Sequence, residues 1–192
     1  MAKTSKYGFI YKRNLSPNVE NPMRLEVILA DSAGPLTVGD TVGYSSGYLD
    51  GIAADYAILG ILEGFVCSNG ENLFKSTADN GGTISGDDTF TAASDNTTVH
   101  MVKGIVNIDP NALFQAYNAD ALTQAEVGLW FNTAVLDGTY PDSTTGTGSA
   151  WAVGTQVMQL IELVTTLEDG SAATTVGLFR IGRSQLLNDV TI

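Results

Sequence analysis

The stretch Ala57-Ile58-Leu59-Gly60-Ile61-Leu62-Glu63-Gly64-Phe65-Val66 is the most apolar part of the chain. It includes a glutamate and is far shorter than the roughly 20 apolar residues that a membrane-spanning helix needs. A glycine inside an apolar strand marks a bulge, a sharp bend or a close backbone approach. The stretch therefore predicts a bent strand in a buried sheet.

Two further stretches share this pattern, because Gly104 and Gly177 also stand between apolar residues. Around them, short β-rich runs alternate with Gly, Asn, Asp and Pro, which is typical of a sandwich or a barrel. We expect strands near residues 7–11, 24–30, 36–43, 56–66, 98–108, 127–132, 155–166 and 175–182. The predicted fold class is all-β, a small barrel or tulip-like curled antiparallel sheet, with one or two short helices and an extended N-terminal arm.

The segment that follows Asp109-Pro110 leaves two structures open. Aspartate favours a helix start and proline fits the first helical position, so a helical turn through Leu113 and Tyr117 is one interpretation. The same residues, 112–117, are equally suited to a strand, since six residues are too few for periodicity to decide. A second short helix is expected from Thr123 to Val127.

Composition points to a single globular domain. The chain has 192 residues, of which 44% are hydrophobic and only 16% charged, and its 21 glycines favour turns and strands over solvated helices. Residues 76–98 and 137–150 are rich in small polar side chains, which predicts mobile surface loops. We expect an extended arm over residues 1–22 and one β-barrel-like domain over residues 23–192.

Charge is sorted along the chain. There are 9 Lys and Arg against 21 Asp and Glu, for a formal net charge of -12. No acid precedes Glu20, whereas Lys3, Lys6, Lys12 and Arg13 do. An acidic body repels nucleic acid and anionic lipid, so neither is expected as a partner.

The arm also carries regularly spaced aromatic residues. Tyr7, Phe9 and Tyr11 alternate, so an extended chain turns all three rings to one side. A disordered terminus that only improves solubility is the alternative, but large aromatic rings are usually buried and are not expected in such a tail. We therefore expect a partner interface, and a body that folds without residues 1–15. The predicted interface residues are Lys6, Tyr7, Phe9, Tyr11, Lys12 and Arg13.

Groups that carry catalysis or bind metals are scarce. The single histidine, His100, lies in a strand-like run, and the single cysteine, Cys67, reads as a buried thiol at a strand end. The aspartates of the loop over residues 76–98 do not fit the spacing of an EF-hand calcium site. We expect no enzymatic activity, no cofactor and no metal.

The first residues contain cations but no apolar run of signal-peptide length. This predicts a protein that is made and kept in a cytoplasm, or in a particle assembled there.

Several of these stretches together resemble the head decoration (cement) proteins of tailed bacteriophages. The arm from Tyr7 to Leu15 is similar to a glycine-aromatic arm with basic residues ahead of a leucine. The stretch 57–65 looks like the family's glycine-broken strand, and residues 102–115 resemble a strand followed by Asp-Pro and a phenylalanine. The resemblance implies a homotrimer that binds the major capsid protein on the outer surface of the virion, with the arm as its anchor.

A carbohydrate-binding β module is the alternative from another class. Trp130, Trp151, Tyr140 and Tyr117 are the aromatic residues that would offer stacking faces to a sugar.

Overall fold

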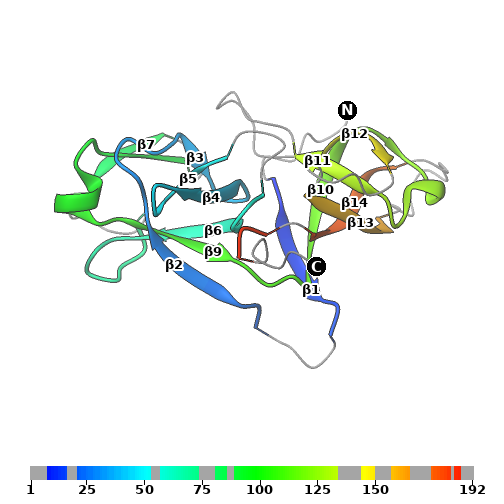
Figure 1. The fold of residues 1–192 in the computed structure, drawn as a ribbon, viewed down its shortest axis with the longest axis horizontal. Helices are drawn as coiled ribbons and strands as arrows, with labels where there is room; N and C mark the ends of the chain where they lie inside the picture. The colour runs from blue at the N-terminus through cyan, green and yellow to red at the C-terminus, as the bar shows by residue number, and fades with distance from the viewer. Residues whose placement is uncertain are drawn as a thin grey trace.

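The computed structural model describes residues 8–16, 21–52, 57–73, 81–85, 89–133, 144–149, 157–164, 174–182 and 184–186. These residues form strands β1 to β14 and two short helical turns, η2 and η3. Figure 1 shows the strands gathered into two lobes that lie side by side. The prediction of an all-β fold is confirmed.

The N-terminal lobe contains two antiparallel sheets. The larger sheet runs in the order β2 (Arg24–Ile28), β9 (Lys103–Asn107), β6 (Gly60–Val66), β4 (Thr41–Ser45) and β5 (Tyr48–Gly51). The smaller sheet runs in the order β3 (Leu36–Thr37), β8 (Thr89–Ala92) and β7 (Gly82–Ser85). Apolar side chains from both sheets share one core, where the rings of Phe65 and Phe90 lie 5.5 Å apart.

The glycine-broken stretch is the central strand of that lobe, as its sequence predicts. The register of β6 with β9 shifts between Leu62 and Gly64, so the strand is bulged. A Cβ at Gly60 would lie 2.1 Å from the carbonyl oxygen of Asn107. Only glycine permits this close approach of β9, because any other residue would push the two backbones apart.

The C-terminal lobe is built around one six-stranded sheet. Its strands are β1 (Ile10–Asn14), β10 (Ala112–Leu122), β12 (Thr144–Ser149), β11 (Trp130–Thr133), β13 (Met158–Leu163) and β14 (Thr174–Ile181). Four buried phenylalanines, Phe9, Phe114, Phe131 and Phe179, fill its core. The strand β10 pairs with β1 along one edge and with β14 along the other.

The segment after Asp109 is a strand, which decides between the two interpretations of its sequence. The Asp109 carboxylate accepts the backbone N–H of Asn111 at 2.8 Å and the side-chain amide of Asn14 at 2.7 Å. Its acceptor capacity is therefore used to turn the chain and to hold the end of β1 rather than to cap a helix. The chain then enters β10, the longest strand described.

The expected short helix after Thr123 is confirmed as the 3-10 turn η3 (Gln124–Glu126). The Glu126 carboxylate accepts the Thr123 backbone N–H at 2.7 Å and the Thr123 hydroxyl at 2.9 Å. Together with the bond from the Glu126 backbone N–H to Thr123, this forms a capping box.

The prediction of loops over 76–98 and 137–150 is wrong for part of each range. Residues 82–85 and 89–92 pair as the hairpin β7–β8, and residues 144–149 form β12. In the first range, Phe90 is fully buried against Phe65, so one aromatic ring anchors a segment whose other residues are small and polar. In both ranges threonine, a good strand former, supplies much of the strand.

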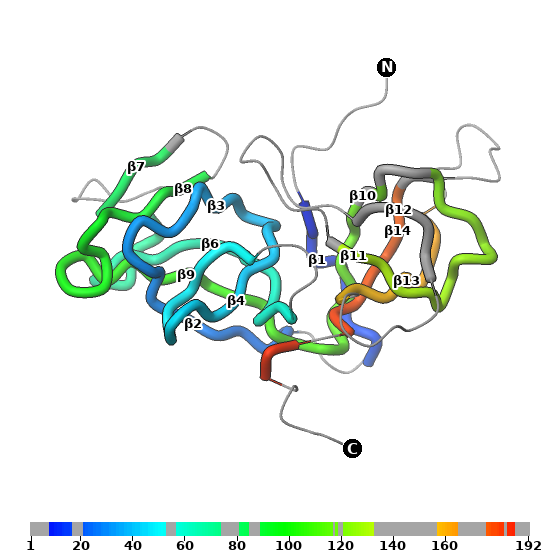
Figure 2. The backbone as a smooth tube through the Cα atoms, turned by 45° about the horizontal axis from the view of Figure 1, so that its top comes forward, coloured from blue at the N-terminus to red at the C-terminus, as the bar shows by residue number. Residues whose placement is uncertain are grey.

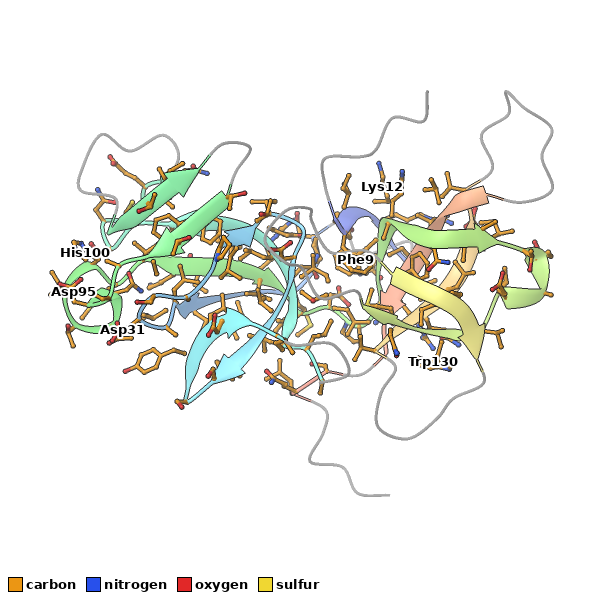
Figure 3. All side chains as sticks on the ribbon, turned by 90° about the horizontal axis from the view of Figure 1, so that it is seen from above. Phe9, Lys12, Asp31, Asp95, His100 and Trp130 are labelled. Carbon is orange, nitrogen blue, oxygen red and sulfur yellow. The ribbon has the colours of Figure 1, made fainter. Side chains whose placement is uncertain are left out.

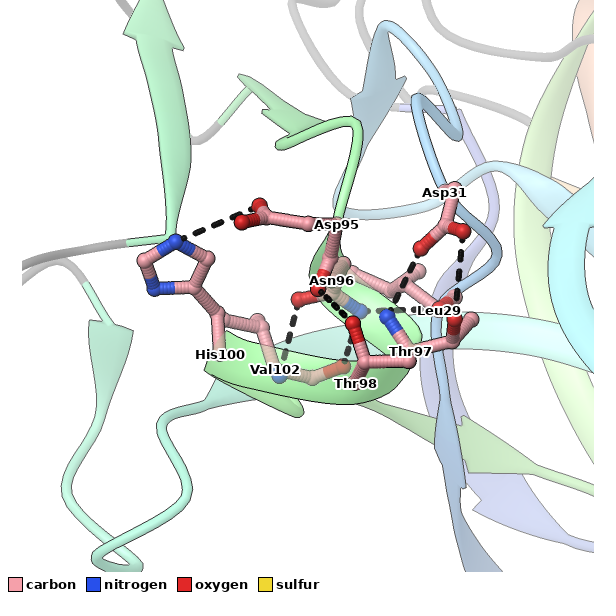
Figure 4. Close-up of polar contacts among 8 residues, drawn as sticks. All are labelled: Leu29, Asp31, Asp95, Asn96, Thr97, Thr98, His100 and Val102. Atoms are coloured by element: carbon pink, nitrogen blue, oxygen red, sulfur yellow. Dashed lines mark hydrogen bonds and ion pairs between the residues drawn. The ribbon is translucent and has the colours of Figure 1, made fainter.

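A five-residue π-type turn, η2 (Asn96–His100), stands where the sequence predicts the start of a strand. Figure 4 shows its polar contacts. The fully buried Asn96 amide donates to the carbonyls of Leu29 and Val102 at 2.8 and 3.2 Å, and its oxygen accepts the Val102 N–H at 3.0 Å. The Asp31 carboxylate accepts both the N–H and the hydroxyl of Thr97. The Asn96 side chain therefore makes hydrogen bonds to the backbone of Leu29 and Val102 that a neighbouring strand would otherwise make.

The two lobes are joined by backbone contacts from both ends of the described chain. The N–H of Phe9 donates to Gly39 at 2.9 Å, and the N–H of Gln185 donates to Ile58 at 2.7 Å. Ile58 also belongs to the core of the C-terminal lobe. Figure 2 shows β1 on the side of its lobe that faces the N-terminal lobe.

Candidate functional site

The residues expected at a partner interface lie on and around β1. Lys6 and Tyr7 fall outside the described residues. Phe9 is only 3% exposed, and its ring meets that of Phe179 edge-on at 6.5 Å. Tyr11 is half-buried and lies 6.2 Å from Phe114, also edge-on.

The expected role of Phe9 as an exposed anchor is therefore corrected. The alternation of rings is real, but it turns Phe9 and Tyr11 into the core of their own lobe. The cause is that β1 finds its strand partner in β10 of the same chain. Residues 8–14 are thus part of the folded lobe rather than of a separate arm.

A β-bulge in β1 exposes two consecutive cations. Tyr11 lies opposite Phe114 and Arg13 lies opposite Leu113, so Lys12 is an extra residue without a partner position. Simple alternation would point Arg13 to the same side as Tyr11, toward the core. The bulge breaks that alternation, and both Lys12 and Arg13 are exposed. Figure 3 shows Lys12 and Phe9 on opposite sides of this strand.

A third cation comes from the other end of the chain. Arg180 lies in β14 next to Phe179, whose ring is in the core, so Arg180 points to the outer face of the sheet. Since β1 and β14 flank β10, their backbones lie two strand spacings apart, about 10 Å. We call Lys12, Arg13 and Arg180 the cationic face.

Two of the three cations on the cationic face lack, among the described residues, the glutamate partner that Arg24 and Lys103 have in the N-terminal lobe. In the N-terminal lobe, Arg24 pairs with Glu63, and Lys103 pairs with Glu26 at 3.3 Å. On the cationic face, Arg180 donates to the neutral Gln159 at 2.7 Å. Arg13 pairs with Glu162, and within the part of the chain that the structure describes Lys12 has no acidic partner.

The aromatic residues of the alternative sugar-binding interpretation are not brought together among the described side chains. Tyr140 and Trp151 fall outside the described residues, and the side chain of Tyr117 is not described. Trp130 packs against the backbone of Gly182, where an added Cβ would lie 1.6 Å from its ring. Its contact with Gly182 uses part of the ring surface that a sugar would need.

The residues considered for catalysis and metal binding lie elsewhere. Cys67 is a free, buried thiol just after β6, as predicted. The His100 imidazole lies 3.4 Å from the Asp95 carboxylate at the tip of the N-terminal lobe, in η2 rather than on a strand. Among the described residues, no group of three or more His, Cys, Asp or Glu side chains is placed to hold a metal ion.

No helix in the described ranges is long and apolar enough to cross a membrane. Comparison of the chain with protein-family models, with curated proteins and with solved structures finds no match.

Sequence reasoning missed Arg180. The sequence places basic residues near both ends, but only the topology brings the ends together, because β10 pairs with β1 on one side and β14 on the other. The apolar residues and glycine before Arg180 predict that it lies in a strand. They do not predict that this strand pairs with β10, which brings Arg180 close to β1.

Proposed function

We propose that this chain is a structural virion protein that binds the outer surface of a tailed-bacteriophage capsid and decorates or stabilises it. One observation carries the proposal: cations from both ends of a chain of net charge -12 gather on one face of the C-terminal lobe. A contrasting patch of this kind steers a protein toward an acidic surface and fixes its orientation there. The role is structural, with no catalysis and no cofactor, and its partner is the major capsid protein.

The proposal divides the roles of the N-terminal residues. Lys12 and Arg13 contact the shell together with Arg180, and Lys6 and Tyr7 extend this contact, since they directly precede the lobe in the chain. Phe9 is assigned to the fold and Tyr11 to the support of β1, because both rings pack within the lobe. The protein resides on the virion, assembled in the host cytoplasm.

Reversing the charge of the cationic face should abolish binding to heads. Lys12→Glu and Arg180→Glu each place an acid opposite an acidic shell, and we expect each to weaken binding about tenfold or more at low salt. The measurement is cosedimentation with tailed-phage heads assembled from purified major capsid protein.

Lys103→Glu is the matched control, because it reverses an exposed cation on the N-terminal lobe. Its binding should stay within about twofold of the original protein, and the difference between lobes should shrink as salt screens the attraction. Equal loss for Lys103→Glu and Lys12→Glu would mean that net charge alone governs binding. Retention of full occupancy by the double variant Lys12→Glu, Arg180→Glu would refute the proposed contact surface.

We further propose that the protein is a homotrimer whose C-terminal sheet curls into a small barrel. The curling is supported by the pairings β10–β14, β14–β13, β13–β11 and β11–β12, from which β12 returns to β10 at Asn118 and Thr144. Association is supported by β7, an edge strand of the smaller sheet that pairs only with β8 among the described strands, since proteins commonly cover such edges by pairing. Sedimentation of the free protein should give three times the 20.2 kDa chain mass; a monomer both free and released from heads would refute the trimer.

A further inference from the structure

We propose that Glu162 is a built-in competitor for Arg13, which sets how acidic a surface must be before this protein binds it. The inference rests on the function proposed above, because it concerns the same face. It assigns to Glu162 a role in selecting the partner rather than in holding the fold together.

The two side chains meet across the sheet. Arg13 comes from β1 and Glu162 from β13, with β10 and β14 between them. Three strand spacings amount to about 14 Å, so both side chains must extend along the outer face to form their ion pair. The face beneath them carries Leu113 and Leu178, which are buried although they point away from the core phenylalanines.

A bulge places each charge on that face. In β13, Met158 and Leu160 point inward, and simple alternation would turn Glu162 inward as well. The register with β14 shifts between Leu160 and Glu162, so Ile161 is the extra residue. Arg13 follows the bulge at Lys12 in the same way. Two independent bulges therefore bring this one pair of opposite charges to the surface.

The pair is open to exchange with an outside acid. The Arg13 and Glu162 side chains are 58% and 53% exposed, and an ion pair in that much water is weak. A carboxylate on a partner can take the place of Glu162 on the guanidinium, which releases Glu162 to solvent. On a surface with scattered acids, this exchange replaces one weak ion pair by another and adds little binding energy. A dense acidic patch contacts Lys12 and Arg180 as well as Arg13, and so binds more tightly.

Glu162→Gln tests the idea, because it removes the competing charge and keeps the size of the side chain. We expect this variant to bind heads about two- to fivefold more tightly at low salt, with the gain lost at high salt. Glu26→Gln is the matched control: it makes the same charge change at an exposed ion pair, with Lys103 on the other lobe. It should leave binding within about 1.5-fold of the original protein.

The variant Arg13→Gln shows whether the gain passes through Arg13. In the Arg13→Gln background, Glu162→Gln should give no more gain than Glu26→Gln does. An equal gain with and without Arg13 would overturn the inference, and so would equal gains for Glu162→Gln and Glu26→Gln in the original chain. Melting temperatures of all variants serve to confirm that each is folded.

The same four variants are also measured on a surface coated with poly-L-glutamate, which separates the two proposals. If the original protein ignores heads, the proposed function fails, and the poly-L-glutamate series still decides the role of Glu162. If the original protein binds heads but Glu162→Gln gains nothing on either surface, the function stands and the competitor role is refuted.

Discussion

Phe9→Ala should lower the free energy of unfolding of the C-terminal lobe by about 3–5 kcal/mol, the usual cost of removing a buried phenylalanine. The ring is almost fully buried against Phe179 and belongs to the main core of that lobe. Loss of the Phe9 ring also weakens the packing that keeps β1 paired with β10. Trp130 is the first residue of β11, and Trp151 falls between β12 and β13 in the chain, so tryptophan fluorescence during urea unfolding is the measurement.

Leu15→Ala is the control for this change, because Leu15 follows β1 and is exposed. We expect it to shift stability by no more than about 0.5 kcal/mol. An unfolding midpoint for Phe9→Ala equal to that of Leu15→Ala would mean that β1 does not contribute to the stability of the lobe.

Because Phe9 and β1 belong to the folded lobe, truncations intended to test binding need to stop before Gly8. The expectation that the body folds without residues 1–15 is revised accordingly.

Asn96→Ala should destabilise the N-terminal lobe by about 2–6 kcal/mol. The substitution leaves the Leu29 carbonyl and the Val102 N–H without the bonds that the buried Asn96 amide makes to them, and each buried orphan costs about 1–3 kcal/mol. The measurement is urea unfolding followed by far-UV circular dichroism, which reports both lobes, compared with tryptophan fluorescence.

Thr97→Ala is the control within the same turn. It removes one hydroxyl bond to Asp31 and keeps the backbone bond to the same carboxylate, so a loss below about 1 kcal/mol is expected. If Asn96→Ala were no worse than Thr97→Ala, the turn would be held by its backbone alone.

The strands with apolar patterns were predictable from the sequence, and the pairing of distant segments was not. The bent strand around Gly60 and the strand that contains Gly177 follow from apolar runs broken by glycine. The hairpin around Phe90 escaped prediction because its single large side chain is diluted among Thr, Ser and Gly. Burial of Phe90 depends on Phe65, a residue that lies outside the hairpin's own sequence.

Only part of the candidate site was predictable from the sequence, because its other residues are placed by pairing between distant strands. The exposed cations Lys12 and Arg13 were identified from the charge asymmetry of the N-terminal segment. The inward direction of Phe9 depends on β10, and the arrival of Arg180 beside them depends on β14. The bulges at Lys12 and Ile161 were not predictable in this way, because no glycine stands beside either residue to mark them.

The position of β10 between β1 and β14 has a consequence for the order in which a newly made chain acquires its structure. The N-terminal lobe takes its strands from β2 to β9, a continuous part of the chain, so it is able to fold while synthesis continues. The C-terminal lobe needs β1, which is made first, and β14, which is made last. The residues of β1 therefore wait until β14 has been made before their lobe closes, and such long-range closure is intrinsically slow. During that wait the core around Phe9 is incomplete, so the N-terminal lobe is able to fold before the cationic face is assembled.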